Sequence, residues 1–231
     1  SDTADTKVEI VTDIAKLEVQ SNMLTSTDMQ ADTISLSIAR VDADELEPEI
    51  ARQIGDRPVV KLTLTVGNKT VEWNNPDAPV TVTIPYTPTA EELKDPEHIV
   101  VWYIDGSGNI VTIPNGRYNP ENGTVTFTTT HFSNYAVAYV HKTFTDLGSS
   151  PWAKKAIEVM ASKGIISGKG NDIFSPTENI TRADYLMLLI KTLGLTADFE
   201  DNFDDVERNA YYYEAVGIAK KLNIAAGSGN N

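Results

Sequence analysis

The segment NITRADYL, residues 179–186, places an arginine where a helix should begin. Thr181 is followed three residues later by Asp184 and then by an apolar run, which is the pattern of a capping box at a helix N-terminus. Arg182 therefore occupies the first helical position, where the helix dipole disfavours an added cation by about 0.3–1 kcal/mol. The helix itself therefore gives no reason for an arginine at this position.

A second chemical pattern is the triplet HFS, His131 to Ser133. It resembles the scissile triplet of autoproteolytic domains in some nucleoporins and death-domain scaffolds. Ser133 would attack the Phe132 carbonyl there, with His131 as the base. The alternation of residue types around the triplet also fits a plain strand, with Phe132 on one face and the other two residues on the opposite face. We expect the bond between Phe132 and Ser133 to stay intact.

The remaining patterns offer little catalytic chemistry. DGSGN, residues 105–109, spaces oxygen ligands like a calcium loop, but Ile110 replaces the required glycine and no acidic residue follows at the twelfth position. We expect a hairpin turn there. Zero cysteines and only three histidines argue against a zinc site. We predict no metal, no cofactor and no enzymatic activity.

The composition is that of a folded, acidic chain. It has 231 residues, of which 41% are hydrophobic, so it can bury a core. The formal net charge of −14 disfavours nucleic acid and anionic membrane surfaces as partners. No apolar stretch reaches the length of a membrane span, so we also expect no membrane insertion.

Two periodicities divide the chain. Up to about residue 142, apolar residues alternate, as in VVKLTLTVG and VTVTIPY, between turn signals such as NPENG, which predicts an N-terminal all-β antiparallel sandwich over residues 1–142. After residue 144 the apolar spacing becomes helical, as in WAKKAIEVMASKG and RADYLMLLIKTLG. Ser150 and Pro151 predict the start of the first of these helices. We therefore predict a multidomain protein whose second part is α-helical.

The second part contains an internal repeat. A shift of 59 positions aligns several identical or similar residues without a gap: Phe144 with Phe203, Asp146 with Asp205, Trp152 with Tyr211, and Gly168 with Gly227. Repeats of this kind bury their apolar faces against neighbouring copies. The second copy stops before any counterpart of NITRAD. We expect the natural protein to continue with further copies.

Residues 144–195 resemble an S-layer homology repeat. The Phe-x-Asp opening, the Trp, the Gly-Ile-Ile-x-Gly turn, the Phe-x-Pro and the Thr-Arg-Ala-acid segment all occur in order. The usual glutamate of the last motif is Asp184 here, which shortens its reach. On this resemblance we assign residues 143–197 to one full repeat and residues 198–231 to the first part of a second, both in an α-helical repeat region.

The resemblance implies noncovalent attachment of an exported bacterial protein to the cell wall, in an extracellular location at the wall or S-layer. Its ligand would be secondary cell-wall polysaccharide, an anionic polymer often carrying pyruvylated N-acetylmannosamine. The implied ligand residues are Arg182 for the carboxylate, Asp146 for sugar hydroxyls or for orienting the arginine, Trp152 for the apolar sugar face, Ser167, Gly168 and Lys169 in the glycine turn, and Asp205 and Tyr211 in the second copy. No arginine of the second copy matches Arg182.

Structural alternatives exist for these residues. Asp146 can cap a turn, Trp152 can belong to the core, Lys169 can be a solvated turn residue, and Arg182 can pair with Asp146 or Asp205. Two other functions also stay open beside wall anchoring with the β domain as spacer or stalk. One is self-cleavage at HFS, and the other is a glycan-binding β-sandwich, which exposed Trp73, Trp102 or Tyr118 on one face would favour.

Overall fold

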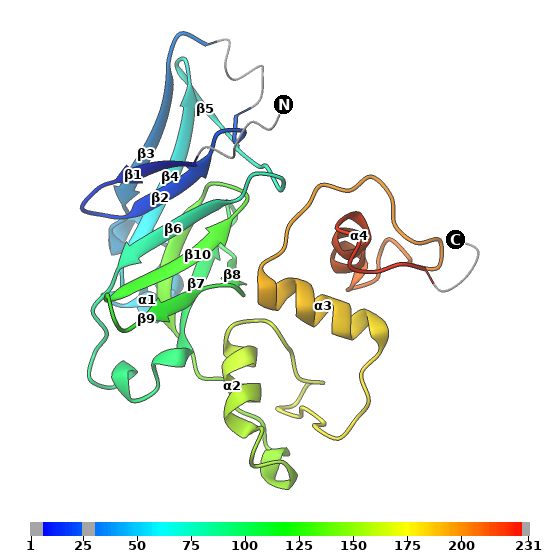
Figure 1. Ribbon diagram of the computed structural model, residues 1–231. Coiled ribbons are helices and arrows are strands. Elements are labelled where there is room, and N and C mark those ends of the chain that lie inside the picture. The colour runs from blue at the N-terminus through cyan, green and yellow to red at the C-terminus, as the bar shows by residue number, and fades with distance from the viewer. Residues whose placement is uncertain (1–6, 25–30, 228–231) are drawn as a thin grey trace. The chain divides into compact units, whose positions relative to one another are not determined.

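The structure is a computed structural model that describes residues 7–24 and 31–227. The chain divides into two compact units, Ser1–His141 and Lys142–Asn231, which we call unit 1 and unit 2 (Figure 1). None of the helices in the described residues is both long and apolar enough to cross a bilayer.

Unit 1 is built mainly from strands that belong to two antiparallel sheets. The strands are β1 (Lys7–Val11), β2 (Lys16–Gln20), β3 (Ile34–Arg40), β4 (Val59–Val66), β5 (Lys69–Val71), β6 (Val80–Pro85), β7 (Ile99–Ile104), β8 (Ile110–Ile113), β9 (Arg117–Asn119), β10 (Thr124–Thr129) and β11 (Asn134–Tyr139). The helical elements are α1 (Pro48–Ile54) and the 3-10 helices η2 (Ala43–Glu45), η3 (Glu92–Lys94) and η4 (Pro96–His98).

The first sheet has the order β1-β2-β6-β10-β9, and the second has the order β3-β4-β11-β7-β8 with β5 added beside β4. Their facing sides share one core, to which β2, β6 and β10 contribute Leu17, Val82 and Phe127, and the second sheet contributes residues such as Val101 and Tyr135. Because side chains alternate along a strand, every second residue of central strands such as β4, β6 and β7 enters this core. The alternation seen in the sequence therefore predicts the inner faces correctly.

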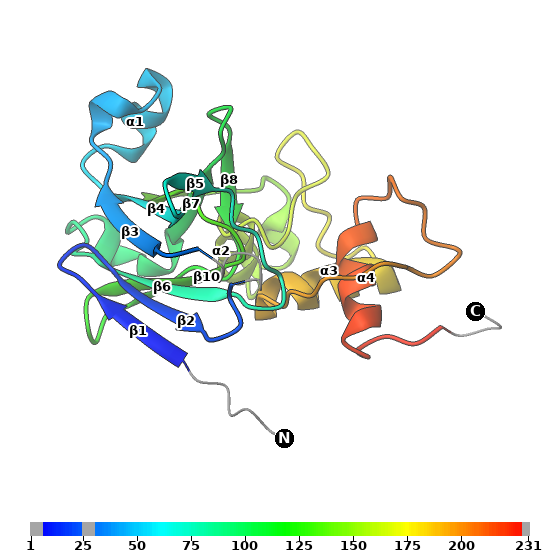
Figure 2. The same cartoon turned by 90° about the horizontal axis from the view of Figure 1, so that it is seen from above.

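Part of the outer face of the second sheet, over β7 and β11, is also buried. Ile50 and Ile54 of α1 lie in a second apolar cluster with Val100, Trp102 and Ala136 from β7 and β11. Figure 2 shows the resulting layers, with α1 on one side of the second sheet and the first sheet on the other. The run IVVWYI in β7 has no polar alternation because both of its faces are covered.

The expectation of an all-β first part is therefore wrong in one respect, because α1 is an integral layer of unit 1. The segment DADELEPEIARQIG contains this helix, and its pattern predicts a connecting helical turn between strands whose length the proline limits. Pro48 opens α1 at its first position, where a missing N–H costs nothing, and Gly55 ends it with φ of 62°.

The expectation of an α-helical repeat region is also wrong. Unit 2 has α2 (Lys154–Ser162), α3 (Arg182–Leu193) and α4 (Tyr213–Lys221), of 9, 12 and 9 residues, and the 3-10 helix η5 (Leu147–Ser149). The stretches 163–181 and 194–212 between these helices contain no helix. Helix α2 begins at Lys154 and not at Pro151, since the Ala153 N–H donates to the Ser150 carbonyl and closes a turn there. The protein is mostly β, with few helices.

The core of unit 2 lies between α3 and α4. Leu186 and Ile190 of α3 are buried with Val216 and Ala219 of α4, in a cluster that the loop residue Phe199 also joins. A Cβ at Gly217 of α4 would lie 2.2 Å from the Phe199 ring, so only glycine lets this loop approach the helix.

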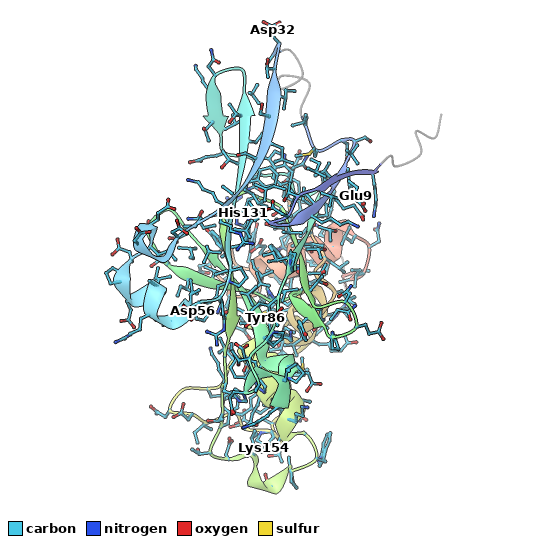
Figure 3. All side chains as sticks on the ribbon, turned by 90° about the vertical axis from the view of Figure 1, so that its left-hand side faces the viewer. Glu9, Asp32, Asp56, Tyr86, His131 and Lys154 are labelled. Carbon is cyan, nitrogen blue, oxygen red and sulfur yellow. The ribbon has the colours of Figure 1, made fainter. Side chains whose placement is uncertain are left out.

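A buried carboxylate joins three segments of unit 1. Glu92 in η3 is 1% exposed, and its oxygens accept hydrogen bonds from Arg57 Nε, the Tyr86 hydroxyl and the Thr89 N–H, each at 2.7 Å. Figure 3 shows Tyr86 among the dense side chains of unit 1. Burial alone would raise the pKa of Glu92, but these donors together hold it below its ordinary value.

We predict that Glu92→Gln lowers the free energy of unfolding by about 3 kcal/mol at pH 7, the lower end of the range for a broken buried ion pair, because Arg57 keeps some contact with water. A carboxyl whose pKa is lowered by folding stabilises the protein above its unfolded pKa of about 4.3 and loses that effect as the pH falls. Urea denaturation from pH 7 to pH 3 should therefore show the difference between parent and variant shrinking. The exposed Glu91→Gln is the control, and an equal loss there would contradict the assignment.

Candidate functional site

The N-terminus of α3 has the predicted capping box. The Thr181 hydroxyl accepts the Asp184 N–H at 3.1 Å, and the Asp184 carboxylate accepts the Thr181 N–H at 3.0 Å. The same carboxylate accepts the Tyr211 hydroxyl at 2.5 Å. The Tyr211 hydroxyl and then the Thr181 N–H hold the pKa of Asp184 below its ordinary value. Asp184 thus joins the start of α3 to the aromatic residue that precedes α4.

Arg182 lies at the first position of α3 and is exposed. Its Nη2 donates to the Ala226 carbonyl at 2.8 Å. The side chain lines a groove of about 360 Å³, whose other lining residues include Asp205, the apolar side chains of Leu186, Phe203 and Val216, and the segment Ala225–Gly227. The groove therefore brings Arg182 from the first copy beside Asp205 from the second.

Asp146 engages the backbone. Its two oxygens accept the N–H groups of Phe174 at 3.0 Å and Ser175 at 2.7 Å, and these hydrogen bonds hold its pKa below the ordinary value. Ser175 has φ of 64°, in the left-handed region that non-glycine residues rarely adopt. Asp146 thus holds the loop before α3 in a conformation that has little local preference. Asp205, which aligns with Asp146, is exposed.

The glycine turn is shaped by packing. A Cβ at Gly168 would lie 2.6 Å from both the Ile173 carbonyl oxygen and the Phe144 ring. The Lys169 N–H donates to the Ile173 carbonyl at 2.7 Å, and its ammonium forms an ion pair with Glu178. Ser167 is exposed. The close approach of the Phe144 ring and the Ile173 carbonyl thus requires a glycine at position 168. The charge of Lys169 is neutralised by Glu178.

The two aligned aromatic residues are among the most exposed large side chains. Trp152 is 88% exposed and precedes α2, and Tyr211 is 70% exposed and precedes α4. Trp152 therefore does not belong to the core, which removes one alternative. Exposed rings of this kind can stack on the apolar face of a sugar.

The HFS triplet is a crossing between sheets and not a strand, contrary to the alternation. Strand β10 of the first sheet ends at Thr129, and β11 of the second begins at Asn134. Phe132 packs on Trp73, with ring centroids 4.5 Å apart, and Ser133 Oγ donates to the Ile104 carbonyl at 2.8 Å. His131 lies among the side chains of unit 1 (Figure 3), and burial lowers the pKa of its imidazole. With its hydroxyl proton directed to Ile104, Ser133 is not arranged as a nucleophile activated by His131.

The other patterns of unit 1 are structural. Asp105 Oδ1 accepts the N–H groups of Ser107 and Asn109 in the β7–β8 hairpin, which confirms the predicted turn. Trp73 and Trp102 are 6% and 8% exposed, so neither presents a ring face to a sugar. The proposed glycan-binding face of the β unit therefore lacks its two tryptophans.

The match to a known protein family lies in unit 2. Residues 143–186 match the model of the S-layer homology domain. This match includes Asp146, Trp152 and the capping box, and it ends before α4. Such domains belong to proteins of the bacterial cell surface, and we place the protein there.

The curated relatives fall into enzymes and surface-layer proteins. Amylopullulanase of Thermoanaerobacterium thermosulfurigenes is 29% identical over 227 residues, which is 97% of this chain and 11% of that protein. The surface-layer 125 kDa protein of Lysinibacillus sphaericus is 33% identical over 34% of this chain and 7% of its own length. S-layer protein EA1 of Bacillus anthracis is 30% identical over 40% of this chain and 11% of its own length. The chain thus spans about a tenth of the length of these relatives, and no solved structure matches it.

Sequence reasoning missed three partners in the site. These are the Ala226 carbonyl that accepts from Arg182, the Glu178 carboxylate that pairs with Lys169, and the Asp184 carboxylate that accepts from Tyr211. A backbone carbonyl leaves no signal in the sequence. For the contact of Tyr211 with Asp184, the sequence offers only the alignment of Tyr211 with Trp152, which marks Tyr211 as a residue of interest.

We predict that Gly168→Ala destabilises unit 2 by about 1–3 kcal/mol, the usual cost of overpacking, because the added methyl group meets the Phe144 ring and the Ile173 carbonyl. Gly148→Ala is the matched control, since nothing lies within 4 Å of a Cβ there. Thermal unfolding followed by the helical circular dichroism signal would measure both. Equal midpoints for the two variants would rule out the close packing of the glycine turn.

Proposed function

We propose that this chain anchors an exported bacterial protein noncovalently to the cell wall through secondary cell-wall polysaccharide. The observation that carries the proposal is the S-layer homology match at residues 143–186, together with relatives that are S-layer proteins. Domains of this family attach surface proteins to the wall. The enzymes among the relatives fit the same role, because the chain covers only about a tenth of their length and leaves their catalytic activity to other regions.

The proposed ligand is an anionic, pyruvylated amino sugar of that polymer. One of the five N–H donors of Arg182 meets Ala226 in the described residues, which leaves others for a carboxylate. The α3 N-terminus adds favourable backbone dipoles on the same side. Asp205 in the same groove would accept sugar hydroxyls, and Trp152, Tyr211 and the Ser167–Lys169 turn are further candidate contacts.

We assign Asp146 a supporting role in this site. Because both of its oxygens hold the Phe174–Ser175 backbone, it would shape the loop before α3 without meeting the sugar. Residues 143–197 would form one repeat and residues 198–231 the beginning of a second. In support, α2 and α4 have the same length, and each boundary differs by 59 positions.

Unit 1 would act as a spacer or stalk. Its tryptophans are buried, its HFS segment lies in a packed crossing, and its polar clusters hold loops together. The similarity to amylopullulanase includes both units, so the same pair of units recurs in a larger protein.

The proposed function predicts sedimentation with cell walls. A chain extended to the full repeat array should pellet with purified bacterial walls and stay in solution after the secondary polysaccharide is chemically removed, because the polymer is its receptor. The control is an array in which an unrelated domain replaces residues 1–141. It should pellet with intact walls in the same way, because the repeats and not unit 1 are proposed to bind. Equal pelleting with intact and stripped walls would exclude polysaccharide as the receptor.

Arg182→Ala should weaken binding of a soluble monovalent pyruvylated sugar by about 1.5–3 kcal/mol, the range for a charge-assisted hydrogen bond. Arg182→Lys should recover part of the loss, because an ammonium keeps the charge without the planar fork. Calorimetry with the extended chain avoids the avidity of whole walls.

The matched control is Arg208→Ala, which removes another exposed arginine of unit 2 and should leave the affinity unchanged. The capping box remains in every variant, so folding should be retained. Unchanged sugar affinity in Arg182→Ala, with a melting temperature several degrees lower, would identify Arg182 as a scaffold residue bound to Ala226.

A further inference from the structure

Two of the three histidines and one aspartate meet at one place in unit 1. Asp95, His98 and His141 each offer a ligand atom, and these atoms lie within 4.8 Å of one another. Across residues 7–24 and 31–227, no other three His, Asp or Glu side chains come together in this way. His98 is 1% exposed, Asp95 is partly buried and His141 is exposed, so the cluster has a protected side and an open side.

The sheet fixes the position of both imidazoles. His98 ends η4 directly before β7, and His141 follows β11, the neighbour of β7. Tyr139 and Ile99 are the last paired residues of these strands, and one step further the Val140 N–H donates to the His98 carbonyl at 3.0 Å. The two rings consequently stack, with centroids 3.8 Å apart and an interplanar angle of 15°.

The hydrogen bonds of His98 decide which nitrogen faces Asp95. His98 Nδ1 lies 2.9 Å from the Val140 carbonyl oxygen, which can only accept, so Nδ1 carries the proton. In the neutral ring Nε2 then holds a lone pair, and it lies 3.3 Å from Asp95 Oδ2. Two acceptors that face each other at this distance need a cation between them. Either a second proton on His98 or a metal ion supplies it.

We propose that Asp95, His98 and His141 bind a divalent transition metal ion of the zinc class. Two imidazoles and one carboxylate are the ligands that zinc and its neighbours accept, and three protein ligands leave a position for water. The Nδ1–H bond from His98 to a backbone carbonyl is the outer contact that metal-binding histidines usually make. This site departs from the sequence-based expectation of no metal.

The exposed ligand completes the site. His141 Nε2 lies 3.0 Å from the Tyr139 hydroxyl. Because stacked rings direct their lone pairs along nearly parallel lines, the exposed His141 ring must turn out of the stack with His98 to share an ion with it. Two ligand atoms of one zinc ion lie less than 4.8 Å apart, because each is about 2.0–2.2 Å from the metal. Ion binding would therefore draw the ligand atoms of this cluster closer together. The bound ion would tie His141, the last residue of unit 1, to η4.

The test is metal titration of the full chain without a histidine tag. Zn²⁺ calorimetry should give one saturable site, and Co²⁺ should give a visible absorption band from the same site. His141→Ala and Asp95→Asn should each weaken Zn²⁺ binding by about tenfold or more, because each removes one of three ligands. Zn²⁺ should also raise the unfolding temperature of the parent, since it binds only the folded form of the cluster.

Glu91→Gln is the matched control, since it removes an exposed carboxylate four residues before Asp95 and should leave the affinity unchanged. Because His141 and part of Asp95 face solvent, both ligand variants should keep the circular dichroism spectrum of the parent. Absence of saturable Zn²⁺ and Co²⁺ binding would overturn the proposal and leave a protonated His98 paired with Asp95. Binding that both ligand variants retain would also overturn it.

Discussion

The candidate site depends on one carboxylate, that of Asp184. It accepts the Thr181 N–H, which α3 cannot satisfy within itself, and also the Tyr211 hydroxyl from the segment before α4. A negative charge at a helix N-terminus is favoured by the dipole, and the lowered pKa of Asp184 keeps it ionised to a lower pH than an ordinary aspartate. One short side chain thus fixes both the start of α3 and its relation to the second copy. The groove beside Arg182 is lined by residues of both α3 and α4, such as Leu186 and Val216.

Local features of unit 2 were predictable from sequence and nonlocal ones were not. The capping box involves residues within one helical turn, so the spacing of Thr181 and Asp184 is enough to predict it. The start of α2 was misplaced because Ser150 and Pro151 suit a turn as well as a helix, and the backbone bond from Ala153 to Ser150 selects the turn. The long loops were missed because the groups that hold them, such as the Phe174 and Ser175 amides on Asp146, are far along the chain.

The same distinction applies to unit 1. Alternation predicted the inner faces of the sheets, but it continues through HFS without a break, so it could not reveal that the chain leaves one sheet for the other there. His98 and His141 meet because β7 pairs with β11. The residues next to each histidine in the sequence do not indicate this contact. The number of histidines therefore could not reveal that two imidazoles meet, because strand pairing decides this.

Charge sets a further condition on an anionic ligand. The chain has a formal net charge of −14, so it repels a polyanion at long range, although salt screens exposed charges beyond about 8 Å at physiological ionic strength. Lys169 pairs with Glu178 and Lys220 pairs with Asp201, so these cations are already neutralised. Arg182 instead donates to a neutral carbonyl and keeps its positive charge at the groove. Asp205 in the same groove would repel a simple anion but would accept hydroxyl groups. An acidic sugar, the ligand proposed above, carries both a carboxylate for Arg182 and hydroxyl groups for Asp205.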